Sequence, residues 1–120
     1  MSIPRITQIM ENYYAPTFSN TTGAAAIAKT VTAATAWDLY EIRIHLSAAG
    51  GEGNLTATMD AAAGAAYDVL LLTQDMTAVT DYVYHPEYPI HFAAGDELDI
   101  AWANAQTKTY GLTVIYRATV

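Results

Sequence analysis

The chain has 120 residues, which suits one domain and leaves no room for two. It contains no cysteine, so thiol catalysis, thiolate metal sites and disulfide frameworks are excluded. Its 12 acidic and 5 basic residues give a formal net charge of −7. Because the basic residues are scattered along the chain, we expect no nucleic-acid partner and no membrane partner.

The balance of residue types is unusually apolar for a small soluble monomer. Apolar residues make up 52% of the chain and charged residues only 14%. One interpretation is that the surplus covers a subunit interface. The other is that alanine and threonine, which are abundant here, suit a crowded sandwich core and an uncharged surface. Composition alone leaves both interpretations open.

The first 22 residues differ from the rest of the chain. Prolines and a Ser-Asn-Thr-Thr cluster punctuate them, yet they carry more large apolar groups than a disordered tail would hold. We expect residues 1–22 to form an N-terminal arm, which either folds back over its own domain or docks on a neighbouring subunit or a capsid lattice. The predicted interface residues are Ile3, Arg5, Ile6, Ile9, Tyr13, Tyr14 and Phe18.

The start of the chain lacks the continuous apolar stretch of a secretory signal. No run approaches the roughly 18 apolar residues that a membrane-spanning helix needs. We therefore expect a complete, soluble chain that is made in the cytoplasm.

Four segments follow the arm in the first half of the chain. Residues 24–32 predict a weak strand, because alanines dilute its apolar pattern. Apolar and polar residues alternate over 40–46 and again over 55–60, which is typical of strands with one solvated face. The alanine-rich stretch 61–66 is too short to nucleate a helix and contains a glycine, so we expect a loop.

The second half predicts five more strands. Residues 67–73 are apolar on both faces, which indicates a strand that is buried on two sides or lies in an interface. Strands are also expected over 80–84, 88–92, 97–103 and 109–118. The third of these five contains a proline, which cannot donate to a ladder, so it belongs at a sheet edge.

Eight short strands, with turn signals about every 8 to 12 residues, indicate an all-β fold. We predict an eight-stranded antiparallel sandwich or jelly roll over residues 23–120, preceded by the arm. Strand alternation also predicts which side chains share one core. They are Tyr40, Ile42, Ile44, Leu98, Ile100, Trp102, Leu112 and Val114.

Candidate chemical sites are weak. His85 and His91 flank a proline-rich turn, but two histidines without a third ligand do not define a metal site. The Asp-Glu-Leu-Asp run at 96–99 offers oxygen ligands without the spacing of a known calcium loop. Ser47 lies in a flexible turn that would not hold a nucleophile rigid. We therefore predict no catalytic residue, no metal and no cofactor, and a protein that is not an enzyme.

The C-terminal third carries a recognisable pattern. In residues 89–102, a proline-led strand is followed by Gly95-Asp96 and a second apolar strand, and residues 109–116 close with Tyr-Gly-Leu-Thr-Val. This pattern resembles the end of many viral jelly-roll proteins and of trimeric tumour-necrosis-factor-like jelly rolls. Among these, a small acidic chain that is rich in alanine and threonine and has no cysteine is most similar to decoration (cement) proteins and head-fibre base domains of tailed bacteriophages.

The resemblance implies a non-enzymatic structural protein on the capsid surface of a virion. Such a protein binds the major capsid protein or another virion protein across subunit boundaries and stabilises the shell. It also implies a closed homo-oligomer, for which a trimer is favoured. No binding residue is implied, because these families share a fold more than a motif.

Two alternatives come from other classes. A carbohydrate- or ligand-binding β-sandwich, for example a virion fibre head, would use Trp37, Trp102 and surface tyrosines as a platform. Trp102 shares its face with core residues, whereas the position of Trp37 is undecided from the sequence. A cupin-type enzyme would need histidines clustered inside a barrel, and the three histidines here are predicted at a solvated face, a turn and an edge.

Overall fold

The computed structural model describes residues 15–119 of the chain, and within them it contains nine β-strands and one 3₁₀ turn. The strands are β1 (Thr17–Gly23), β2 (Ile27–Val31), β3 (Trp37–Leu46), β4 (Asn54–Asp60), β5 (Val69–Asp75), β6 (Asp81–Tyr84), β7 (Ile90–Phe92), β8 (Glu97–Trp102) and β9 (Tyr110–Ala118), and η1 (Ala65–Tyr67) precedes β5. Among the described residues, no helix is long and apolar enough to cross a membrane.

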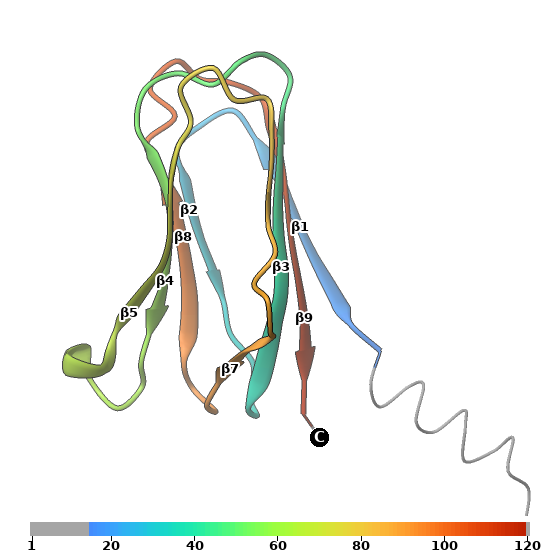
Figure 1. Ribbon diagram of the computed structural model, residues 1–120, viewed down its shortest axis with the longest axis vertical. Helices are drawn as coiled ribbons and strands as arrows, with labels where there is room; N and C mark the ends of the chain where they lie inside the picture. The colour runs from blue at the N-terminus through green and yellow to red at the C-terminus, as the bar shows by residue number, and fades with distance from the viewer. Residues whose placement is uncertain (1–14, 120) are drawn as a thin grey trace, which may run out of the picture.

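Two antiparallel sheets pack face to face (Figure 1). Sheet A has the order β1-β9-β3-β6, with β7 also paired to β3, and sheet B has the order β2-β8-β4-β5. Strands β6 and β7 pair with different halves of the same edge of β3, so they act as one interrupted strand. Counted in this way, the molecule has four strands in each sheet, and their order is that of a jelly roll.

The predicted all-β antiparallel sandwich is confirmed, but the strand count of eight and the arm boundary at residue 22 are wrong. Thr17–Gly23 is a strand that pairs along its whole length with β9, from Thr17 opposite Tyr116 to Gly23 opposite Tyr110. Residues 17–22 therefore belong to the sandwich. An edge strand whose side chains mostly face solvent can have the polar composition of a turn, and the Ser-Asn-Thr-Thr run of β1 has it.

The core lies between the sheets, and the alternation of each strand selects its members. Seven of the eight predicted core residues are buried: Ile42, Ile44, Leu98, Ile100, Trp102, Leu112 and Val114. Six of them are followed by a residue that is exposed or partly exposed, whereas Val114 is followed by the buried Ile115. Trp37 also lies in this core, with its ring stacked on Phe92 at a centroid distance of 4.0 Å.

The eighth predicted core residue, Tyr40, is not buried, because β3 contains a β-bulge. Leu39 pairs with Tyr116 and Glu41 pairs with Ile115, so Tyr40 is the extra residue between two consecutive pairs of the ladder. A bulge of one residue reverses which parity faces the core. Leu39 is fully buried in place of Tyr40.

One of the two interpretations of residues 67–73, a strand that is buried on two sides, is wrong for β5. It forms an outer edge of sheet B, where only β4 pairs with it. Leu72 points into the core, whereas Val69 and Leu70 are 48% and 60% exposed. The apolar pattern on both parities therefore reflects an apolar solvent-facing edge.

Candidate functional site

All three histidines of the chain lie on the outer face of sheet A, and each contacts a carboxylate across the seam between β3 and the β6–β7 edge. The pairs are His45–Asp81 at 2.5 Å, His85–Glu41 at 3.2 Å and His91–Asp38 at 2.9 Å, each measured from Nδ1 to a carboxylate oxygen. Cross-strand pairs of this kind stabilise a ladder modestly when they are exposed. The histidines are thus spread along the seam and do not converge on one point.

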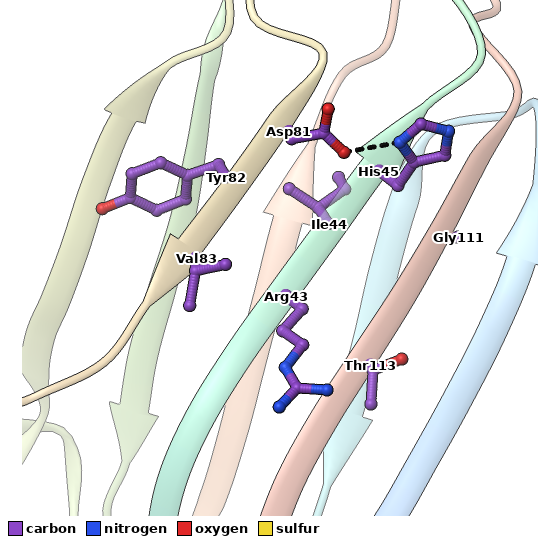
Figure 2. A pocket seen from close by; sticks show the side chains of 8 residues that line it. All are labelled: Arg43, Ile44, His45, Asp81, Tyr82, Val83, Gly111 and Thr113. Carbon is purple, nitrogen blue, oxygen red and sulfur yellow. Dashed lines mark hydrogen bonds and ion pairs between the residues drawn. The ribbon is translucent and has the colours of Figure 1, made fainter.

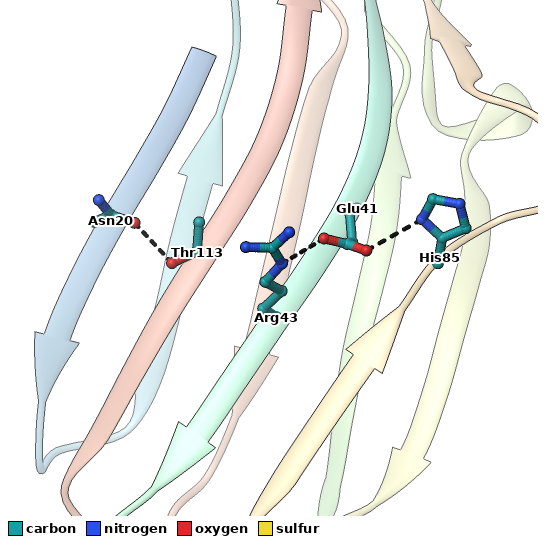
Figure 3. A network of polar contacts seen from close by, with 5 residues as sticks. All are labelled: Asn20, Glu41, Arg43, His85 and Thr113. Carbon is teal, nitrogen blue, oxygen red and sulfur yellow. Dashed lines mark hydrogen bonds and ion pairs between the residues drawn. The ribbon is translucent and has the colours of Figure 1, made fainter. Parts of the chain in front are cut away.

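A network of polar contacts continues across the same face (Figure 3). The Glu41 carboxylate contacts the His85 ring on one side and accepts a hydrogen bond from the Arg43 guanidinium on the other. One strand further, the Thr113 hydroxyl donates to Asn20 Oδ1 at 2.7 Å. One set of contacts thus joins β3 to the end of β6, and a separate one joins β9 to β1, and both satisfy polar groups within the sheet face.

An open hollow of about 380 Å³ lies on this face beside Gly111 (Figure 2). A Cβ at Gly111 would meet nothing within 4 Å, so the missing side chain helps to leave the hollow open. Arg43, His45 and Asp81 are among its lining residues, but His45 already contacts Asp81 and Arg43 already contacts Glu41. The lining includes no serine, cysteine or lysine, so the hollow offers polar contacts without a nucleophile of these types.

Three carboxylates meet where β4 ends and β8 begins. The ligand oxygens of Asp60, Glu97 and Asp99 all lie within 4.8 Å of one another. Partial desolvation, followed by the negative charges of Asp68, Asp99 and Asp96, raises the pKa of Asp60. Oxygen donors of this type suit a hard cation such as Ca²⁺, but exposed carboxylates are common without one.

The structure separates the members of the predicted oxygen-ligand run 96–99. Asp96 is buried, and its carboxylate accepts hydrogen bonds from the backbone N–H groups of Ala62 and Ala93, both at 2.9 Å. It therefore joins two loops and does not face the cluster as a ligand. Asp60, which belongs to a strand more than 30 positions earlier, could not be placed beside Glu97 and Asp99 without the β4–β8 pairing.

Both tryptophans belong to the core. Trp37 and Trp102 are 0% and 2% exposed, so neither can form a flat surface for a sugar ring or another ligand. Within the described residues, the indole N–H group of each has no hydrogen-bond partner. The carbohydrate platform proposed from these two residues is therefore not formed.

The predicted interface residues fall into two groups. Six of them lie outside the described residues: Ile3, Arg5, Ile6, Ile9, Tyr13 and Tyr14. The seventh, Phe18, lies on β1 opposite Ile115 and is 54% exposed. Phe18 is thus an exposed apolar side chain of the sandwich rather than part of a separate arm.

A second exposed apolar surface lies at the start of β5. Tyr67, Val69 and Leu70 are 65%, 48% and 60% exposed, and we call these three residues the β5 strip. They are half of the six exposed large apolar side chains in the described part of the chain. Exposed apolar side chains at a sheet edge are typical of an interaction site. The apolar pattern of residues 67–73 was the sequence signal for it.

A comparison with models of known protein families found no match, and neither did a comparison with curated proteins.

Proposed function

We propose that this chain is a non-enzymatic structural protein of a virus particle, which decorates the capsid surface and stabilises the shell. Its partner would be the major capsid protein or another virion protein, bound across subunit boundaries. The observation that carries the proposal is an exposed apolar strip on a sheet edge of a jelly roll. A sandwich of this kind contributes interface area rather than chemistry.

The arrangement of polar groups supports this proposal. The histidines and the carboxylates beside them are occupied with one another across the β3 seam, and the interior between the sheets is filled by the core. A decoration protein stabilises a shell because opening the shell would expose the surface that the protein buries. Apolar side chains on an edge supply such surface at about 25 cal/mol per Å².

A closed homo-oligomer, with a trimer favoured, is part of the proposal. A ring of copies uses the same patch repeatedly and leaves no open end that could polymerise. Sedimentation or light scattering of the purified chain measures the mass directly. A trimer gives three times the chain mass of 12.9 kDa; a single 12.9 kDa species at all concentrations would contradict self-assembly in solution.

The alternative, a ligand- or carbohydrate-binding module such as a fibre head, has one observation in its favour. The hollow beside Gly111 presents Arg43, Thr113 and the His45–Asp81 pair around an open space. Binding of a glycan library by the native chain, lost in the Arg43→Ala variant, would favour this alternative over decoration.

Virus particles purified from a culture that carries the gene, and from one in which the gene is deleted, test the main proposal. We expect the chain to be present in the first particles by mass spectrometry. Particles without it should release their genome at a lower temperature, and added purified chain should reverse the loss. Absence of the chain from the particles, or release temperatures that do not differ, would contradict the proposal.

A further inference from the structure

We propose that residues 1–14 of one copy bind the β5 strip of a neighbouring copy and so link the copies into a ring. The inference extends the proposed function, since it names the surface through which a decoration protein would assemble with itself. It rests on three features: an apolar sheet edge, the position of the chain entry, and the apolar composition of the segment.

Strand β5 is an apolar sheet edge that carries no proline and no basic residue, unlike the β6–β7 and β2 edges. The β6–β7 edge is interrupted by Pro86 and Pro89. On the β2 edge, Lys29 occupies the same parity as the buried Ile27 and Val31, and a charge that points inward discourages association. Strand β5 reads Val-Leu-Leu-Leu-Thr-Gln-Asp, without proline or a basic residue.

The position of the chain entry lets the segment reach an adjoining copy. The chain enters the sandwich at β1, and β1 and the β5 strip lie at the same end of the molecule but at opposite edges (Figure 1). A segment that leaves at one flank and binds at the other flank of the next copy makes a head-to-tail contact, which forms a ring when the rotation between copies closes. A segment of 14 residues reaches at most roughly 50 Å, which is enough to pass to an adjoining small domain.

The segment complements the strip in apolarity. Seven of its side chains are large and apolar: Met1, Ile3, Ile6, Ile9, Met10, Tyr13 and Tyr14. Its two charged residues, Arg5 and Glu11, have opposite signs, so the match with the strip is one of apolar groups. The apolar residues would cover Val69 and Leu70.

Disulfide trapping tests this contact without interference, because the native chain has no cysteine. An Ile6→Cys chain is mixed with a Leu70→Cys chain under mild oxidation. The matched control replaces Leu70→Cys by Val83→Cys, since Val83 is similarly exposed, at 53%, on β6. We expect the first mixture to give at least tenfold more cross-linked heterodimer than the control.

Three results would overturn the proposal. Equal cross-linking in both mixtures would mean that the contact is not specific. Homodimers of Leu70→Cys that outnumber the heterodimer would mean that two β5 edges pair with each other. An Ile6→Cys, Leu70→Cys double variant that closes only within its own chain would mean that the segment covers its own domain.

A second measurement separates this inference from the function on which it rests. Leu70→Asp should reduce the mass in solution to that of one chain while the far-ultraviolet circular dichroism of the sheets is retained, and Val83→Asp should leave the oligomer intact. If Leu70→Asp leaves the oligomer unchanged, the inference is wrong even when the native chain binds virus particles. If the cross-link forms but the chain is absent from particles, the inference stands and the proposed function is wrong.

Discussion

At the scale of single residues, Asn104 holds the loop between β8 and β9. Its Nδ2 group donates to the carbonyl oxygens of Ala25 and Lys108, both at 2.9 Å, and its Oδ1 accepts the Lys108 N–H at 2.8 Å. The residue is 2% exposed and has a φ of 48°, a left-handed conformation that asparagine tolerates better than most residues. Its side chain thus supplies hydrogen bonds to backbone groups that are not paired in a sheet in this loop.

Replacing Asn104→Ala should lower the free energy of unfolding by about 2–4 kcal/mol, because three buried hydrogen bonds are lost and their backbone partners stay behind. Urea denaturation measures the change. The control, Gln106→Ala in the same loop, should change stability by less than about 0.5 kcal/mol, because Gln106 is exposed. Equal effects of the two variants would contradict the role assigned to Asn104.

Asp60 and Asp75 make opposite predictions for the pH dependence of stability. The pKa of Asp60 is raised from 3.8, so the folded protein favours the protonated carboxyl. Protonated Asp60 therefore stabilises the fold in acid, and this stabilisation is lost as the pH rises through the raised pKa. A backbone hydrogen bond from Thr77, supported by the Thr77 side chain, lowers the pKa of Asp75. Ionised Asp75 therefore stabilises the fold above pH 3.8, and this stabilisation is lost as the pH falls through the lowered pKa. At neutral pH, Asp60→Asn should therefore stabilise the protein, whereas Asp75→Asn should destabilise it.

Denaturation of both variants at neutral pH and in acid checks these signs. The gain from Asp60→Asn should shrink as the pH falls toward 3.8, since the native carboxyl then protonates as well. The loss from Asp75→Asn should persist further into acid, until the lowered pKa is passed. A loss of stability for Asp60→Asn at neutral pH would contradict the raised pKa of Asp60 and its causes, desolvation and like-charge repulsion.

At the scale of elements, alternation predicted strands β3, β8 and β9 well because each has one apolar and one polar face. It could not predict the bulge in β3, because one extra residue changes the parity without leaving a mark in the residue types. Strand β1 was missed since an exposed edge strand of serine, asparagine and threonine has the composition of a turn. The carboxylate cluster was missed because Asp60 reaches Glu97 and Asp99 only through the β4–β8 ladder.

The bulge makes a direct prediction for neighbouring residues. Leu39→Ala should cost about 2–5 kcal/mol, because Leu39 is fully buried. Tyr40→Ala should cost roughly 1 kcal/mol, since the ring is only half-buried and its contact with the Arg117 guanidinium, at 5.2 Å, is worth little near the surface. Thermal and urea unfolding of the two variants measure both losses of unfolding free energy. A larger loss for Tyr40→Ala than for Leu39→Ala would place the bulge elsewhere.

At the scale of the whole molecule, the net charge of −7 is unevenly distributed. The outer face of sheet A holds all three histidines together with Arg43 and Arg117, next to Asp38, Glu41 and Asp81. The end of sheet B near the β5 strip is strongly acidic, with carboxylates from two strands and two loops. They belong to Asp60, Asp68, Asp96, Glu97 and Asp99. A partner would thus meet a mixed surface on one sheet and an acidic one on the other.

The proposed role requires that the chain occupy a fixed set of sites on a shell. Titration of purified chain onto virus particles that lack it, with the bound mass measured after sedimentation, tests this most directly. We expect binding to saturate at a constant number of copies per particle and to withstand moderate salt, because apolar contacts are not screened. Bound mass that rises without limit, or that is lost when salt is added, would contradict a decoration protein.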